Sequence, residues 1–387
     1  MNKVYLDYAA TAPCDPEVLK AMTPYFFDKF GNASSIHSFG QDAKKAVEDS
    51  RQTLAEFLGA RADEIVFTSG GTESNNFAII GSALARKAKG DHIITSVIEH
   101  HAVTEPCKFL EKQGFKVTYV KVDKYGRVSA EDIKKEITDK TILISLMHAN
   151  NEIGTIQPVS EVGRLARERG ICFHTDAVQT TGHIPVNVDN LSVDLLSLSA
   201  HKFYGPKGVG ALYVRKGTRL ETFLHGGDQE NGRRASTHNT PGIVGLAYAI
   251  ELCRKNMKPE AEFQMALRDR LIKELPPLIP EVYLNGHPTE RLPNNANFSI
   301  KYIEGESILL SLDMLGIAAS TGSACTSSSL EPSHVLLAIG LTHELAHGSL
   351  RISLGRWTKK EDIDYLLEVL PGIAKKLRAM SPLYEGK

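Results

Sequence analysis

Cysteine is scarce in this chain, and its placement excludes two common structural uses. The 387 residues include five cysteines, an odd number without any C-x-x-C pair, at positions 14, 107, 172, 253 and 325. Cysteines so far apart support neither a disulfide framework nor a zinc site made of cysteine alone. The fold is therefore expected to rest on a hydrophobic core, and the length predicts two domains.

An excess of one charge and long apolar runs are also missing. Lys and Arg number 45 against 46 Asp and Glu, which leaves a net charge of −1, and no stretch of eighteen residues is apolar. This balance argues against nucleic acid or an anionic membrane as a partner, and no membrane span is predicted. The opening MNKVYLDYAATAP lacks the apolar segment of a secretory signal, so we expect a cytoplasmic protein.

Short β-branched runs alternate with helix-length segments between about residues 60 and 215. The expected strands are EIVFTSG, HIITSVI, KVTYVKV, ILISLMHA, ICFHTDA, LLSLSAH and GALYVR, with helices expected at 72–89, 102–113, 129–137 and 158–169. This alternation predicts an α/β fold, a mostly parallel sheet with helices on both faces. Ligands of such sheets bind at the carboxyl ends of the strands.

After residue 216 the pattern changes to that of a smaller α+β domain. A polar loop at 225–242 precedes a long helix at about 242–275. We expect strands near 295–301, 317–320 and 349–354, and helices near 305–315 and 360–380. The predicted boundaries give a large domain of residues 15–255 and a small domain of residues 1–14 and 256–387.

Lys202 and Asp176 each follow an apolar strand, in SLSAHKFYGPKG and CFHTDAVQ. A lysine at the end of a buried strand is costly to desolvate, and Schiff-base formation is its main chemical use there. Pyridoxal 5′-phosphate needs such a lysine for its aldehyde and an acid for its ring nitrogen. The structural alternative is a surface lysine and an aspartate that caps a helix.

Two further segments carry candidate residues for the same site. Glycines in TSGGTESNN place Gly71 and Thr72 between a strand and a helix, where backbone N–H groups suit a phosphate. His100 follows another strand and can stack on a flat ring and carry protons. Each motif alone is also compatible with an ordinary turn or a structural histidine.

Cys325 lies in STGSACTSSSLEP, a polar segment expected to be mobile, whereas Cys107, Cys172 and Cys253 lie in apolar or helical contexts and are expected to be buried. A mobile thiol suits the collection of an atom in one place and its delivery in another.

A competing motif, HELAH (343–347), matches the zinc-peptidase pattern HExxH. A helix that ends at Gly348, the lack of a third histidine and the nearby cation Arg351 argue against zinc.

Together these motifs resemble the cysteine desulfurases of the NifS/IscS type, which are class V aminotransferase-group enzymes with pyridoxal phosphate and fold type I. The resemblance extends from VYLDYAATAP (4–13) to LRAMSPLYEGK (377–387). It includes, in order, FGNASSIH, FTSGGTESNN, EHHAV, NNEIGTIQP, HTDAVQ, SAHKFYGPKG, GSACTSSSLEPSHV and SLRISLGRWT. HELAH corresponds to an ordinary helix in that family.

The resemblance implies a role for each candidate. Lys202 looks like the Schiff-base lysine and proton carrier, Cys325 the persulfide-forming nucleophile, and His100 a stacking residue that acts in proton transfer. The remaining implied contacts are Asp176 with the ring nitrogen, Gln179 with the ring oxygen, and Gly71, Thr72, Ser199 and His201 with the phosphate. Asn151 is expected to contact both the cofactor and the substrate, Arg351 the substrate, and Thr237 the phosphate of the partner subunit of a homodimer.

The implied reaction converts L-cysteine to L-alanine and leaves a persulfide on Cys325 for iron–sulfur cluster assembly. The long Cys325 loop and the tail SPLYEGK resemble those of enzymes that hand sulfur to an iron–sulfur scaffold protein of the IscU/NifU type. In the family the persulfidated cysteine also helps to ligate a [2Fe–2S] cluster on the bound scaffold. The alternatives are a selenocysteine lyase, a class V aminotransferase, a non-catalytic sulfur-relay protein and the zinc peptidase.

Overall fold

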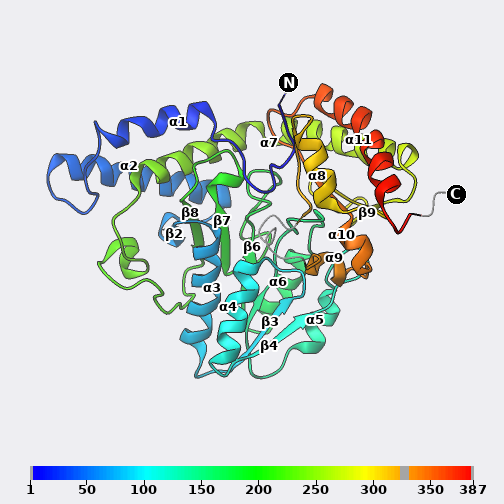
Figure 1. Ribbon diagram of the computed structural model, residues 1–387. Helices are drawn as coiled ribbons and strands as arrows, with labels where there is room; N and C mark the ends of the chain where they lie inside the picture. Colours follow the sequence, from blue (N-terminus) through cyan, green and yellow to red (C-terminus); the bar gives the residue numbers. More distant parts are fainter. Residues whose placement is uncertain (1–2, 323–330, 385–387) are drawn as a thin grey trace.

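A seven-stranded sheet forms the centre of the larger part of the molecule (Figure 1). The computed structural model describes residues 3–322 and 331–384. The strands lie in the order β2-β8-β7-β6-β5-β3-β4. Only the pairings of β8 with β2 and β7 are antiparallel, so the prediction of a mostly parallel sheet is confirmed. The strand bounds are β2 Ile65–Thr68, β3 His92–Ser96, β4 Lys116–Val120, β5 Thr141–Ser145, β6 Cys172–Asp176, β7 Leu195–Ser199 and β8 Gly210–Val214.

Helices cover both faces of this sheet because neighbouring strand residues point to opposite sides. Val66 and Leu195 belong to the core on the side of α3 and α4, whereas Phe67 and Leu196 belong to the core on the other side. The first side holds α3 Gly71–Arg86 and α4 His101–Lys112. The second holds α2 Ser38–Leu58, α5 Ala130–Glu136, α6 Val159–Glu168 and the first half of α7 Thr240–Leu278.

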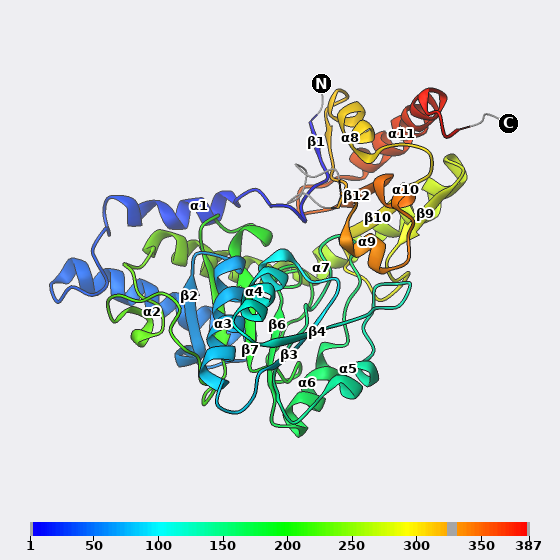
Figure 2. The same ribbon diagram turned by 60° about the horizontal axis from the view of Figure 1, so that its bottom comes forward.

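A second, smaller sheet lies beside the far end of α7 (Figure 2). It is antiparallel, in the order β12-β10-β9, and its bounds are β9 Val282–Asn285, β10 Asn295–Ile300 and β12 Ser349–Ser353. Its core is shared with α7 and with helices α8 Gly305–Asp313 and α11 Lys360–Met380. The predicted α+β character of this region agrees with the structure.

The two ends of the chain meet in this smaller region. Strand β1 (Val4–Tyr5) pairs in parallel with β11 (Ile317–Ala318), and Asp7 forms a bridge with Ser353 at the end of β12. The remaining helical segments are α1 Pro16–Met22, η1 Thr23–Phe26, η2 Ala62–Glu64, η3 Ala200–Lys202, η4 Gln229–Gly232, α9 His334–Ala338 and α10 His343–His347. Helix α7 is slightly longer than expected, and α10 ends before Gly348 as expected.

Within residues 3–322 and 331–384, no helix is long and apolar enough to cross a membrane. The domain boundaries predicted at residues 14/15 and 255/256 stay a prediction.

Candidate functional site

The candidate residues of the large sheet follow strand ends at one edge. Strands β2 and β7 are both antiparallel to β8, so their carboxyl ends lie at the same edge as those of β3, β5 and β6. Asp176 is the last residue of β6, and Lys202 ends the short helix η3 directly after β7. The fold therefore gathers at this edge the segments that the sequence analysis singled out.

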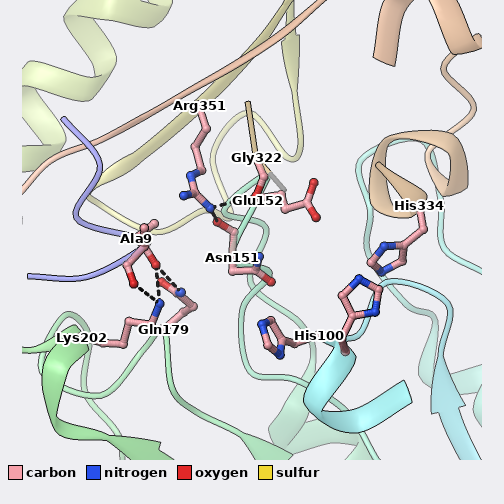
Figure 3. Close-up of a pocket in the computed structure, with 11 residues that line it drawn as sticks. Ala9, His100, Asn151, Glu152, Gln179, Lys202, Gly322, His334 and Arg351 are labelled. Atoms are coloured by element: carbon pink, nitrogen blue, oxygen red, sulfur yellow. Dashed lines mark hydrogen bonds between the residues drawn. The ribbon is translucent and has the colours of Figure 1, made fainter. Parts of the chain in front are cut away.

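The Lys202 ammonium is held by the N-terminal segment (Figure 3). Its Nζ donates to the carbonyl oxygens of Ala9 at 2.6 Å and Ala10 at 2.7 Å. Gln179 Nε2 donates to the same Ala9 oxygen at 3.0 Å, so this side chain belongs to the site. The partial negative charges of two carbonyl oxygens offset the ammonium's cost of burial.

Asp176 is a buried carboxylate with fixed orientation. One of its oxygens accepts a hydrogen bond from Asn75 Nδ2 at 2.6 Å, and the other accepts from the backbone N–H of Val178 at 2.9 Å. The side chain of Asn75 is buried too, and its own oxygen has no hydrogen-bond partner among residues 3–322 and 331–384. A carboxylate so placed offers a strong acceptor and a negative charge to a cation in the site.

His100 caps the N-terminus of α4. Its Nδ1 accepts a hydrogen bond from the backbone N–H of Ala102 at 3.0 Å, which places the proton of the neutral ring on Nε2. Burial is the largest influence and lowers the pKa of His100, while the Asp176 charge opposes this shift and Lys202 adds to it. The neutral ring can donate a hydrogen bond from Nε2.

A cavity of about 180 Å³ lies between the two sheet regions. The side chain of Arg351, from β12, is buried there, and its Nη1 donates to the carbonyl oxygens of Asn151 and Gly322 at 3.0 and 3.1 Å. Its Nη2 donates to Asp7 Oδ1 at 2.8 Å. The residues that line the cavity are Ala9, Ala10, His100, His101, Asn151, Glu152, Gln179, Lys202, Gly322, His334 and Arg351.

A second pocket lies beside the first and has the features of a phosphate site. It is lined by Ser69, Gly70, Gly71, Thr72, Glu73, Ser199, His201, Lys207 and Gly208, with Ala10 and Thr11 on the side of the first cavity. The pocket opens at the N-terminus of α3, which has sixteen residues and whose first N–H groups favour an anion. His201 Nδ1 contacts the Thr11 hydroxyl at 3.0 Å, and burial lowers the pKa of His201 to about 4.

Comparisons with known proteins agree with this geometry. Residues 4–366 match the family model "Aminotransferase class-V". The chain belongs to the class V aminotransferase family. It is 60% identical over 381 residues to the protein named "Cysteine desulfurase IscS" of Dictyoglomus turgidum, covering 98% of this chain and 97% of that protein.

Two solved structures extend the similarity to three dimensions. A structure described as "NIFS-LIKE PROTEIN" has a TM-score of 0.92 and 39% identity, covering 97% of this chain and all of that one. A structure described as "SspA in complex with cysteine" has a TM-score of 0.81 and 40% identity, covering 91% of this chain and 99% of the other. The predicted family resemblance and fold type are confirmed.

Pyridoxal phosphate is the cofactor expected of this family, and the residues present fit it. The negative charge of Asp176 suits a protonated ring nitrogen. The buried oxygen of Asn75, which has no hydrogen-bond partner among the described residues, lies next to Asp176. A Cβ built on Gly71 would lie 2.7 Å from Val178 Cγ2, so this position has room only for glycine as the chain turns into the phosphate pocket. Ala10 both accepts a hydrogen bond from Lys202 and lines the phosphate pocket, so Lys202 lies close to this pocket.

Thr237 lies apart from the phosphate pocket of its own chain. It is exposed, and it is not among the described residues that line this pocket. Its loop is fixed by two ion pairs: Arg51 with buried Glu230 at 2.7 Å and Arg234 with Glu73 at 2.7 Å. These pairs anchor the loop to α2 and to the start of α3, while Thr237 is exposed.

Cys325 lies outside the described residues. Of the four cysteines within them, Cys107, Cys172 and Cys253 are buried as expected, and burial raises the pKa of each thiol to about 12. Cys14 is exposed. The three buried thiols are therefore protonated and inert at neutral pH.

Among the contributors to the site that were not predicted from the sequence, three side chains hold predicted residues in place. Asp7 pairs with Arg351, Asn75 holds Asp176, and Thr11 contacts His201. Asp7 and Thr11 lie in LDYAATAP and Asn75 in TESNN, both among the motifs of the family resemblance. Their position inside these motifs was the signal that could have identified them. The residues that they contact, however, are distant in the sequence.

Proposed function

We propose that this chain is a cysteine desulfurase in which Cys325 receives the sulfur of L-cysteine as a persulfide. The observation that carries the proposal is the position of the Lys202 ammonium, at a strand end next to buried Asp176 and beside a small cavity that contains Arg351. In the net reaction, the C–S bond of L-cysteine breaks and its sulfur joins the Cys325 sulfur. The carbon skeleton takes a proton and leaves as L-alanine, so that all atoms balance.

Pyridoxal phosphate would be held by Lys202 at its aldehyde carbon, by Asp176 at its ring nitrogen and by Gln179 at its ring oxygen. Gly71, Thr72, Ser199 and His201 would hold its phosphate. Bound there, the cofactor supplies an electron sink that makes the Cα proton of an amino acid acidic.

The protein's own residues bind the substrate and move protons. Arg351 and Asn151 orient the amino acid by its carboxylate, because a buried guanidinium binds carboxylates strongly. Lys202 takes the Cα proton as the neutral amine, and the carbonyl oxygens of Ala9 and Ala10 accept hydrogen bonds from it when it is protonated. Neutral His100 would stack on the cofactor ring, where its Nε2–H can donate a hydrogen bond to a group that exchanges a proton.

A homodimer completes the site in this proposal. Thr237 would reach the phosphate bound by the partner subunit, which agrees with its exposed position. The segment from η1 to the first turn of α2 extends away from the rest of the molecule in Figure 1 and exposes Phe26, Phe27, Phe30, Ile36 and Phe39. So many large exposed apolar side chains are typical of a surface that is covered in the assembly.

The sulfur acceptor would be an iron–sulfur scaffold protein of the IscU/NifU type, with a [2Fe–2S] cluster as cargo that the Cys325 persulfide helps to ligate. We also propose the division into residues 15–255 and residues 1–14 with 256–387. The cytoplasmic location stays a prediction.

The test is the visible spectrum of the purified protein before and after addition of L-cysteine, with L-alanine quantified. We expect a yellow protein whose absorption band shifts with L-cysteine and which forms L-alanine. A colourless protein that stays inert with added pyridoxal phosphate would instead support the relay alternative. Parallel assays with L-selenocysteine and L-alanine as substrates separate the lyase and aminotransferase alternatives.

A further inference from the structure

Glu152 is a buried carboxylate in the wall of the cavity, and the proposed reaction gives it no task. The side chain is 3% exposed, yet it lines the cavity together with Arg351 and Asn151 (Figure 3). Its Oε2 accepts a short hydrogen bond from the hydroxyl of Ser333. A buried acid next to a substrate site needs an explanation, because a charge away from water is costly.

The position of Glu152 is fixed from several sides. Its backbone N–H donates to Asn150 Oδ1 at 2.9 Å, and its carbonyl oxygen accepts from Asn297 Nδ2 at 3.1 Å. A Cβ built on Gly322 would lie 3.1 Å from Glu152 Oε2, so the chain packs closely on the carboxylate. The carboxylate therefore has little room to turn away from a bound molecule.

The other charged groups of the cavity wall are already engaged. Arg351 pairs with Asp7 and, in the proposed function, binds the α-carboxylate, while Lys202 is taken up by the cofactor. Burial lowers the pKa of both His100 and His101, which keeps these two rings neutral at pH 7. The His334 ring lies 5.2 Å from that of His101 and donates from Nε2 to the Glu99 carbonyl oxygen at 3.0 Å. Among the described residues that line the cavity, Glu152 is the acidic side chain that would lie near the side chain of a bound substrate.

We propose that Glu152 determines substrate specificity by charge: it admits amino acids with neutral side chains, such as a thiol, and excludes those with a second negative group. This inference rests on the proposed function and deepens it. An anionic substrate side chain inside this small cavity would lie on the order of 7–10 Å or less from the Glu152 carboxylate. Two like charges at this distance near a protein surface correspond to a roughly ten- to fifty-fold loss of affinity.

The first experiment uses L-aspartate and L-asparagine, which have nearly the same shape and differ by one charge. Each is titrated into the holoenzyme, and its dissociation constant is measured from the change in the cofactor's visible spectrum. We expect the wild type to bind L-asparagine at least tenfold more tightly than L-aspartate, and Glu152→Gln to reduce this ratio to threefold or less. The second readout is kcat/KM for L-cysteine sulfinate relative to L-cysteine, which should rise at least tenfold in Glu152→Gln.

Ser333→Ala is the matched control, because it removes the hydrogen bond to Glu152 but leaves the charge. Both ratios should stay at their wild-type values in this variant. The proposal is overturned if the relative kcat/KM for the sulfinate is unchanged in Glu152→Gln, or if Ser333→Ala changes it equally. Failure of the proposed function would be recognised separately, since the wild type would then form no L-alanine from L-cysteine.

Discussion

The ion pair between Asp7 and Arg351 joins the two ends of the chain at the substrate cavity, and replacing Asp7 by asparagine tests what it does. Asp7 Oδ1 accepts from Arg351 Nη2 at 2.8 Å, and the two side chains are 18% and 2% exposed. Asparagine keeps the size and the oxygen acceptor but loses the charge. Among the described residues, the buried guanidinium would then be compensated by neutral oxygens alone, those of the Asn151 and Gly322 carbonyls and of the introduced amide.

The expected magnitude follows from the burial of the pair. A hydrogen bond to a charged group contributes roughly 1.5–3 kcal/mol, and the partly open Asp7 side puts this pair near the lower end, so Asp7→Asn should lower the free energy of unfolding by about 2 kcal/mol. If Asp7 also holds Arg351 in position for the substrate carboxylate, KM for L-cysteine should rise roughly tenfold, which corresponds to about 1.4 kcal/mol. We expect kcat to change less than KM.

The assays are urea unfolding of the holoenzyme and steady-state L-alanine formation, with Asp49→Asn as the control. Asp49 pairs with Lys45 at 2.7 Å, but both side chains are largely exposed, so this variant should be indistinguishable from wild type. The reasoning is refuted if Asp7→Asn has the same unfolding free energy and the same KM as Asp49→Asn.

Three further outcomes are expected. Lys202→Ala should lose the protein–cofactor bond that borohydride can reduce, whereas an unchanged reducible bond would rule out this anchor. Cys325→Ala should keep the cofactor and its spectrum but release no sulfide from L-cysteine, and normal turnover would disprove the nucleophile assignment. Burial lowers the pKa of His148 to about 4 and that of His174 to about 3, so between pH 6.5 and 4 the unfolded chain binds more protons and stability falls as pH falls. At pH 5 each histidine should lower the free energy of unfolding by about 2 kcal/mol relative to pH 7.5. In urea unfolding, His174→Gln should lose correspondingly less of this free energy between the two pH values.

The core of the site was predictable because local sequence patterns determine it. Apolar strand runs that end in a polar residue located Asp176, His100 and Lys202, and the parallel arrangement of strands then requires these ends to share one edge. Gly71 and Thr72 were found in the same way, since a glycine turn before a helix has a recognisable pattern.

The supporting contacts were not predictable, since they depend on which distant segments pack together. Asp7 and Arg351 are 344 residues apart, and Asn75 and Asp176 are 101 residues apart. In the sequence, Asn75 is one polar position of an expected helix. Its contact with Asp176 depends on the packing of α3 against β6. Gln179 likewise contacts the Ala9 carbonyl because the N-terminal segment crosses the cavity.

The meeting of β1 with β11 and of Asp7 with β12 also sets the order in which the enzyme matures on the ribosome. The large sheet is complete once β8 has been made, and domains fold as their segments emerge. The substrate-binding part of the site can form only after Arg351 has been synthesised, because the Asp7 side chain pairs with the guanidinium of Arg351. A nascent chain can therefore build its cofactor-binding half early, yet it cannot consume L-cysteine and release reactive sulfur until the chain has been synthesised as far as Arg351.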